Sequence, residues 1–120
     1  MQHRSILLAE DNEGLRNLYA HILRNDGFEV MAVEDGEAAL DALSRKKPDV
    51  VVTDLNMPHM DGLELIEWIR HQDSLATLPV IAMTAYTEGL MLRAKMAGAT
   101  KVIPKPFDRQ LCFEINGVLN

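Results

Sequence analysis

Short runs of apolar residues alternate along this chain with longer segments in which apolar residues recur every three or four positions. The short runs are typical of strands buried on both faces of a sheet, and the longer segments are typical of amphipathic helices. The pattern predicts strands at 5–9, 28–33, 50–53, 78–84 and 101–104. It predicts helices at 13–24, around 38–43, at 63–71, at 88–97 and from Asp108 through Leu119.

Strands and helices that alternate one by one predict an α/β fold, because two parallel strands are joined by a crossover that is usually a helix. We therefore expect a (βα)5 chain whose doubly wound, five-stranded parallel sheet carries helices on both faces. All residues from 1 to 120 are expected to form this one domain. Asn12 is placed to cap the first helix, and Gly27 to follow its end.

Composition and charge exclude several classes of protein. The net charge of −6 argues against a broad surface for nucleic acid, and no apolar run approaches the length of a membrane span. The first ten residues do not read as a signal peptide. Cys112 is the single cysteine, so no intrachain disulfide can form, and we expect a small core or helix-face residue there. These features predict a cytoplasmic protein.

Charged and hydroxyl residues stand where the predicted strands end. Glu10 and Asp11 follow the first strand, Asp54 follows the three valines of the third, Thr84 ends the fourth, and Lys105 follows the fifth. Ligands of such sheets bind at the carboxyl ends of the strands, so we expect these side chains to meet. Three neighbouring carboxylates repel one another unless a cation lies among them, and a set of oxygen ligands suits Mg²⁺.

Each of these residues alone has a simpler interpretation. Glu10 and Asp11 could be an acidic pair favoured by the dipole of the next helix, Thr84 a strand-end residue, and Lys105 a solvated charge. Their occurrence together, at the ends of successive strands, favours a functional site.

Five short motifs stand in order along the chain: "LLAEDN", "VVTDLNMPHMDG", "VIAMTAY", "AGA" and "KPF". With them the chain resembles the receiver domain of two-component response regulators over essentially its whole length. The resemblance implies a flavodoxin-like sheet with strand order 2-1-3-4-5. It also implies a signalling phosphoacceptor rather than a conventional enzyme, with self-catalysed phosphotransfer and autodephosphorylation.

The resemblance assigns roles to individual residues. Asp54 matches the phosphoacceptor, which takes a phosphoryl group from the phosphohistidine of a sensor histidine kinase or a histidine phosphotransfer protein. Asp11 and Asp54 are implied to hold Mg²⁺ directly, with the backbone carbonyl of Asn56, while Glu10 acts through water. Lys105 is implied to supply a second cation to the phosphoryl oxygens.

Two further matches concern switching. Thr84 matches the hydroxyl that shifts to hydrogen-bond the phosphoryl group, and the small Ala85 beside it leaves that group accessible. Many family members carry Tyr or Phe three residues before the lysine, where this chain has Val102. An aromatic rotamer switch therefore cannot operate at that position. The Lys105–Pro106 bond is a candidate for the cis form, which is common at this place in the family.

The family also suggests where the signal leaves the domain. In the helix at 88–97, Leu90, Ala94 and Ala97 form the expected sheet-packing stripe. Leu92 and Met96 fall on a different face of that helix. With Lys101 and Val102 they are expected to form an output surface for a downstream protein or for self-association, although scattered exposed apolar residues are also common.

Three alternative functions are weighed against this one. A haloacid-dehalogenase-type phosphotransferase normally needs a second Asp two residues after its nucleophile, where this chain has Asn56. A flavodoxin-like cofactor binder needs a phosphate loop after the first strand, where "AEDN" would repel phosphate. A docking module that works without phosphorylation would usually have lost an acid or the lysine.

His59 is interpreted as an exposed, variable loop position, and Gly62 as a residue that shapes the same loop.

Overall fold

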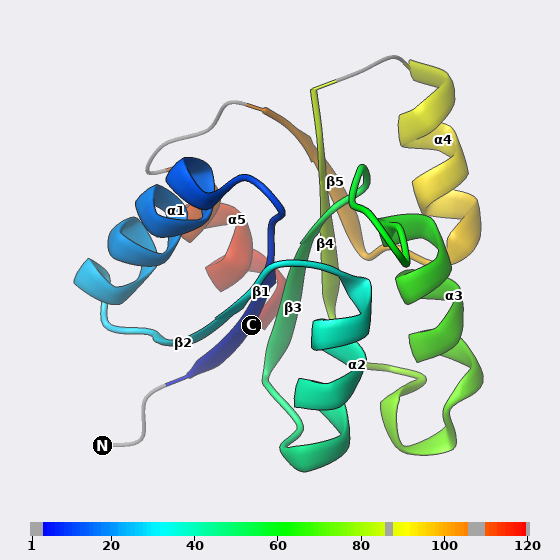
Figure 1. Cartoon of the computed structure of the whole chain (residues 1–120), viewed down its shortest axis with the longest axis horizontal. Coiled ribbons are helices and arrows are strands. Elements are labelled where there is room, and N and C mark those ends of the chain that lie inside the picture. The colour runs from blue at the N-terminus through cyan, green and yellow to red at the C-terminus, as the bar shows by residue number, and fades with distance from the viewer. Residues whose placement is uncertain (1–3, 86–87, 106–109, 120) are drawn as a thin grey trace.

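The computed structural model describes residues 4–85, 88–105 and 110–119 (Figure 1). Its strands are β1 (Ser5–Ala9), β2 (Glu29–Val33), β3 (Val50–Asp54), β4 (Val80–Thr84) and β5 (Lys101–Pro104). Its α-helices are α1 (Glu13–Asn25), α2 (Gly36–Arg45), α3 (Gly62–His71), α4 (Glu88–Ala97) and α5 (Gln110–Leu119), and a short 3₁₀ helix, η1, covers Asp73–Leu75.

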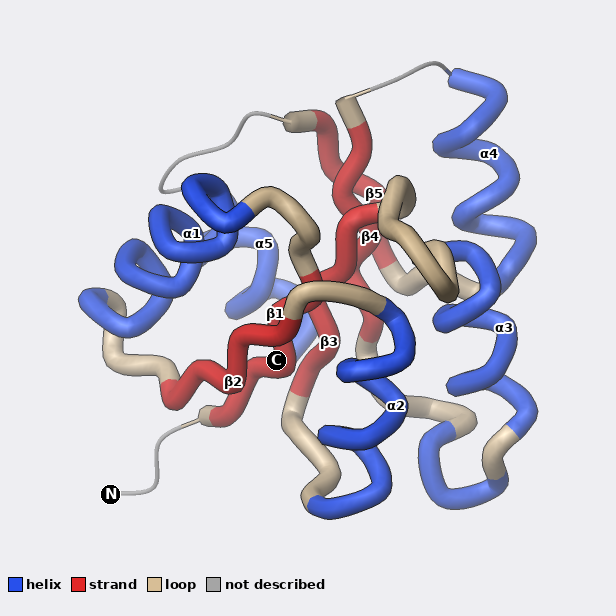
Figure 2. Tube along the Cα trace, viewed as in Figure 1, coloured by secondary structure: helices blue, strands red, loops and turns tan. Residues whose placement is uncertain are grey.

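The strands form one parallel sheet in the order β2-β1-β3-β4-β5, which confirms the predicted fold class and strand order. Helices α1 and α5 lie on one side of the sheet, and α2, α3 and α4 lie on the other (Figure 1). The carboxyl ends of β1, β3 and β4 lie at the same end of the sheet (Figure 2). This is the edge at which a doubly wound sheet places its ligands.

Two apolar clusters fill the space between the sheet and its two helical layers. Successive residues of β3 point to opposite faces, so Val51 packs beneath α2, α3 and α4, while Val50 and Val52 pack beneath α1 and α5. Every residue of β3 is buried. Cys112 is buried in the second cluster, as expected. The central strand therefore gives Asp54, at its end, a rigid support.

Several predicted boundaries were wrong by one or two residues, for local reasons. Strand β2 begins at Glu29 because the amide of Phe28 donates to the Leu23 carbonyl, 3.2 Å away, in the turn that closes α1. Strand β4 begins at Val80 because Leu78 donates to Leu75, 3.0 Å away, in the turn after η1. The predicted start of the last helix at Asp108 and the Lys105–Pro106 bond lie outside the described residues.

The helix ends bear out the sequence signals. Asn12 caps α1, and its Oδ1 accepts a hydrogen bond of 2.9 Å from the Leu15 amide. Gly27, just past the end of α1, has φ +96°, a conformation that glycine adopts without strain. Asp61 and Glu64 form a reciprocal capping box at the start of α3.

Gly62 lies directly against the end of β3. A Cβ atom at this position would lie 2.2 Å from the Asp54 carbonyl oxygen and 2.7 Å from the Cα atom of Leu55. Both neighbours are backbone atoms of a buried strand end, so they cannot move aside easily. The absence of a side chain at Gly62 therefore lets the first turn of α3 pack against Asp54.

We expect Gly62→Ala to lower the free energy of unfolding by about 1–3 kcal/mol, because overpacking forces the backbone apart. The measurement is urea unfolding followed by the fluorescence of Trp68. Gly14→Ala is the matched control, since a Cβ atom there would meet only the Asn12 side chain, at 3.4 Å. A Gly62→Ala protein as stable as Gly14→Ala would show that the contact is not restrictive.

Candidate functional site

The register of the sheet brings Glu10 beside Asp54. Ala9 of β1 is opposite Thr53 of β3, so the next residue of each strand lies at the same level. Neighbouring strands are only about 4.8 Å apart, and the two carboxyl groups must therefore share one small space. On the other side of β3, Asp54 is opposite Met83 of β4, and Thr84 is opposite Pro104 of β5, which brings Lys105 to the same edge.

Lys105 forms ion pairs with both buried carboxylates. Its Nζ lies 2.6 Å from Glu10 Oε1 and 2.8 Å from Asp54 Oδ2. The Glu10 side chain is wholly buried, and those of Asp54 and Lys105 are nearly so. Three neighbouring carboxylates require a cation among them, and in this structure Lys105 supplies one.

Burial and pairing act in opposite directions on these groups. Burial raises the pKa of Glu10, and Asp54 adds to the rise, although hydrogen bonds from Lys105 and the Asn12 amide oppose it. Burial alone would lower the pKa of Lys105, but its hydrogen bonds to Asp54 and Glu10 prevail and raise it. Lys105 is therefore firmly held in its charged form.

Backbone amides fix the remaining carboxylate oxygens. The Asn56 amide donates to Asp54 Oδ1 at 3.1 Å, and the Asn12 amide donates to Glu10 Oε2 at 3.1 Å. Asp11, by contrast, is exposed to solvent. Each of the three acids offers an oxygen within 4.8 Å of the others. The orientation of the Glu10 and Asp54 carboxylates is therefore set before any ligand arrives.

A cleft of about 230 Å³ opens over these groups, lined by Glu10, Asp11, Asn12, Leu15, Asp54, Asn56, Ala85 and Lys105. When the three acids are ionised, Lys105 offsets one of their negative charges and leaves two. A donor set of hard oxygens with a residual charge of two fits a divalent cation such as Mg²⁺. The open side of the cleft leaves room for water as further ligands.

The structure brings together most of the residues predicted for the site. Thr84 is buried at the end of β4 and does not line the cleft, whereas the next residue, Ala85, does. The Thr84 carbonyl accepts a 2.8 Å hydrogen bond from the Lys105 amide, which joins the ends of β4 and β5. Asn12 and Leu15 also line the cleft, although the sequence had shown only a helix cap there.

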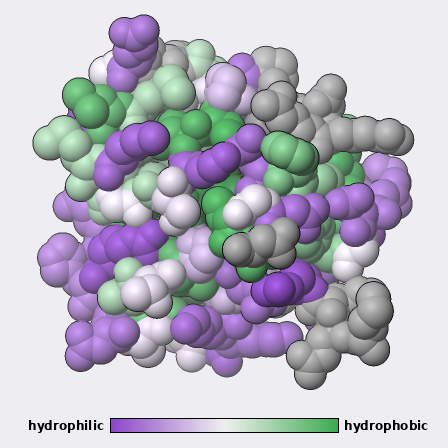
Figure 3. All heavy atoms as spheres, turned by 180° about the vertical axis from the view of Figure 1, so that it is seen from behind, coloured by the Kyte–Doolittle hydropathy of each residue, from purple (hydrophilic) through white to green (hydrophobic). Residues whose placement is uncertain are grey.

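The four residues predicted for an output surface do not all face the same way. Leu92 and Met96 are 61% and 79% exposed, and hydrophobic atoms gather at the upper left of Figure 3, the side on which α4 lies in that reversed view. Met96 lines a groove with α3 residues, among them Glu67 and His71. Lys101 is exposed and pairs with Glu114 of α5.

Val102 is half-buried and packs against the core cluster under α2, α3 and α4. It points inward because Lys101 and Val102 alternate along β5. The buried stripe of α4 is as predicted, with Ala94 buried and with Leu90 and Ala97 packed against the core.

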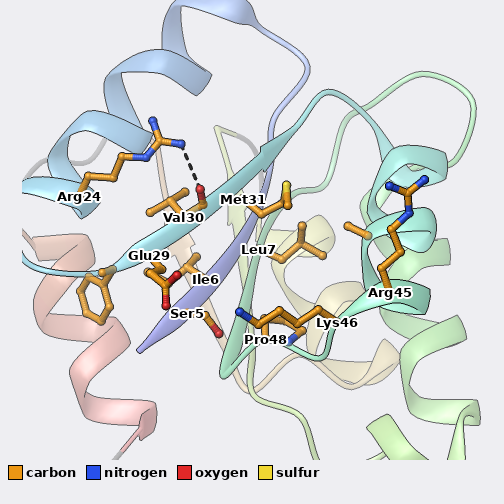
Figure 4. A pocket seen from close by; sticks show the side chains of 12 residues that line it. Ser5, Ile6, Leu7, Arg24, Glu29, Val30, Met31, Arg45, Lys46 and Pro48 are labelled. Atoms are coloured by element: carbon orange, nitrogen blue, oxygen red, sulfur yellow. Dashed lines mark hydrogen bonds between the residues drawn. The ribbon is translucent and has the colours of Figure 1, made fainter. Parts of the chain in front are cut away.

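A separate hollow of about 430 Å³ lies between the edge strand β2 and the end of α2. In Figure 4, Leu7 and Met31 project from the sheet, and Arg45 and Lys46 lie across from them. Ser5 and Pro48 place this hollow at the amino ends of β1 and β3, away from the acidic cleft. Arg24 donates to the Val30 carbonyl at 3.0 Å and so covers part of the exposed strand edge.

Comparison with known proteins shows the family to which this chain belongs. The profile of the family described as "Response regulator receiver domain" matches residues 6–115, and the chain belongs to that family. It is thus a receiver domain of two-component signalling. Among curated relatives, the polar-differentiation response regulator DivK of Brucella anthropi is 33% identical over 104 residues, 86% of this chain and 85% of DivK.

Solved structures of the family superpose closely. Chemotaxis response regulator CheY4 of Vibrio cholerae has a TM-score of 0.90 and 28% identity, covering 99% of this chain and all of that one. The receiver domain of sensor histidine kinase PA1611 from Pseudomonas aeruginosa has a TM-score of 0.87 and 31% identity, covering 95% and 94%. That structure has a magnesium ion coordinated in its active-site cleft.

Among the described residues of the present chain, no helix has the length and apolar character needed to cross a membrane.

We expect Asp11→Asn to raise the free energy of unfolding by about 0.5 kcal/mol without Mg²⁺, because one of the mutually repelling charges is removed from an exposed position. Wild type should gain about 1.4 kcal/mol at a Mg²⁺ concentration ten times the dissociation constant, and the variant should gain much less. Unfolding with and without Mg²⁺ measures both effects. Asp26→Asn, which changes an exposed acid at the end of α1, is the control. A metal-free Asp11→Asn protein less stable than wild type would contradict the repulsion.

Proposed function

We propose that Asp54 is the phosphoacceptor of this receiver domain and takes its phosphoryl group from a phosphohistidine. The supporting observation is the position of Lys105 Nζ, 2.8 Å from Asp54 Oδ2. A cation at this distance can neutralise a phosphoryl oxygen brought to Asp54. The proposed donor is a sensor histidine kinase or a histidine phosphotransfer protein.

The chain's own residues prepare Asp54 for this reaction. The Asn56 amide and Lys105 hold its two carboxylate oxygens, so the side chain is oriented before the phosphorus atom approaches. A carboxylate oxygen of Asp54 attacks phosphorus, and the bond from phosphorus to the donor histidine breaks. Lys105 remains close to the Asp54 carboxylate during this step. Ala85, on the wall of the cleft, leaves space for the phosphoryl oxygens.

Asp11, Asp54 and the backbone carbonyl of Asn56 would hold Mg²⁺, and Glu10 would contribute through water. When bound, Mg²⁺ would spread the negative charge that develops on the transferred group. Glu10 is already fixed by Lys105 and by the Asn12 amide, which suits an indirect role. The chain would then catalyse both its own phosphorylation and the slower hydrolysis of the product. The cytoplasmic location expected from the sequence stays a prediction.

We further propose that Leu92, Met96 and Lys101 form an output surface that binds a downstream protein or a second copy of the chain. Val102 belongs to this surface as the half-buried residue that supports it from the core side. Leu92→Glu and Met96→Glu should each fold and accept phosphate, but weaken phosphorylation-dependent association measured by sedimentation. Met31→Glu is the matched control, because Met31 is 60% exposed on the opposite edge strand. Association of both α4 variants at wild-type strength would place the output surface elsewhere.

Asp54→Asn should abolish phosphorylation by a small donor such as acetyl phosphate with Mg²⁺, because an amide cannot form the acyl phosphate. Intact-mass spectrometry detects the added phosphoryl group. Asp61→Asn is the control, since asparagine can still cap α3 and residue 61 lies outside the cleft. Phosphorylation of Asp54→Asn at the wild-type rate would refute the assignment.

A further inference from the structure

His59 makes a contact that its loop position did not suggest. Its Nδ1 lies 2.9 Å from Asp35 Oδ2, in the turn before α2. Asp35 is only 8% exposed, and its other oxygen, Oδ1, accepts a 2.8 Å hydrogen bond from the Ala38 amide as the cap of α2. Asp35 is therefore a fixed partner, and His59 is the element that can attach to it or release it.

The backbone at His59 adopts a strained turn. The Met60 amide donates to the Pro58 carbonyl at 2.9 Å, and His59 between them has φ +69°. A hydrogen bond across one residue with positive φ is the pattern of a γ-turn of the rare, strained kind. His59 is the one non-glycine residue with positive φ in the part of the chain that the structure describes. Such strain persists only where neighbouring contacts hold it.

The two loops also meet through their backbones. A Cβ atom on Gly36 would lie 2.3 Å from the Met60 carbonyl oxygen, so the start of α2 and the residue after His59 are in close contact. Asp35 directly precedes Gly36 and His59 directly precedes Met60, so their ion pair lies next to this backbone contact. The tip of the loop between β3 and α3 is therefore attached to α2 twice, once by backbone packing and once by the imidazole.

The same loop forms one wall of the phosphoacceptor site. Its base is closed by the Gly62 amide, which donates to the Leu55 carbonyl at 3.1 Å. Asn56 lies just inside that base and donates to Asp54 Oδ1. The Gly62 amide holds the base of the loop and His59 holds its tip, so a movement of the loop would also displace Asn56.

We infer that His59 is a positioning residue of the phosphoacceptor site, which by pairing with Asp35 fastens the loop between β3 and α3 to α2 and so holds Asn56 beside Asp54. The inference rests on the proposed function of Asp54 and adds a residue to its site. His59 does not line the cleft, and it acts on the site through the loop.

Protonation should control the strength of this attachment. The acids that act on the imidazole are Asp35 and Glu34, in the turn after β2, and Glu37, in α2. Its hydrogen bond to Asp35, followed by the charge of that residue, raises the pKa of His59. The Ala38 amide and then His59 lower the pKa of Asp35.

The raised pKa of His59 gives stabilisation that is complete below its ordinary value, about 6.5, and is lost as pH rises through the folded-state value. The lowered pKa of Asp35 gives stabilisation that is present above about 3.9 and lost at lower pH. The attachment is therefore strongest in mildly acidic solution.

Three variants separate positioning from simple stability. His59→Gly removes the imidazole but relieves the turn, so the free energy of unfolding should not fall. His59→Gln offers a neutral donor at every pH. Asp35→Asn removes the charge while retaining the cap of α2. The readouts are the pKa of His59 by NMR, hydrogen-exchange protection of the Asn56 amide, and Mg²⁺ affinity in high salt, where long-range charge effects are screened.

In Asp35→Asn, the pKa of His59 should fall. Both His59→Gly and His59→Gln should expose the Asn56 amide and weaken Mg²⁺ binding by roughly two- to fivefold, the range for an exposed ion pair. Wild-type protection should decline as pH rises through the pKa of His59, and protection in His59→Gln should not follow that titration. Unchanged Asn56 protection and Mg²⁺ affinity in both His59 variants would overturn the inference. A wild-type protein that binds no Mg²⁺ and accepts no phosphoryl group would instead refute the proposed function itself.

Discussion

The pairing of Lys105 with Glu10 and Asp54 is the interaction on which the site depends. Glu10 is wholly buried and Asp54 nearly so, and two such carboxylates side by side would be costly without a cation between them. The lysine makes their burial tolerable, yet it offsets only one charge. The exposed Asp11 keeps the site negative and open to solvent. The same arrangement thus stabilises the fold and leaves a place where a divalent cation and a phosphoryl group can enter.

The fold supplies this arrangement through its central strand. Because every residue of β3 is buried, Asp54 has little freedom at the strand end, and the register with β1 sets Glu10 next to it. The close approach of Gly62 then brings α3 against the same point. The loop between β3 and α3 is then the part of the site whose position depends on contacts made by its own residues. Its attachment through His59 and Asp35 gives that part a defined position and a dependence on protonation.

Much of this could be predicted from the sequence, because the apolar runs and the strand-end acids are local signals with a known consequence in a parallel sheet. The order of elements, the buried strands and the meeting of Glu10, Asp11, Asp54 and Lys105 follow from them. Strand starts at Glu29 and Val80 could not be predicted as well, since Phe28 and Leu78 are apolar but take part in turns.

Side-chain directions and loop contacts were harder to foresee. Strict alternation along β5 would have shown that Val102 points away from Lys101, but the groove that Met96 shares with α3 depends on how two helices pack. Nothing in "NMPHMDG" reveals that His59 has positive φ or that it reaches Asp35, which stands 24 residues earlier in the chain. Contacts of this kind depend on the tertiary structure rather than on local sequence.

A double-mutant cycle between Lys105→Met and Glu10→Gln tests the central claim most directly, with Lys101→Met as a control for losing an exposed lysine. Unfolding without Mg²⁺ gives the free energy of each protein. Lys105→Met alone should lose roughly 3 kcal/mol, because it leaves two buried carboxylates without their cation. Adding Glu10→Gln should restore part of that loss, with a coupling energy of about 1–3 kcal/mol. Additive effects of the two substitutions would contradict the view that Lys105 holds the site together by charge.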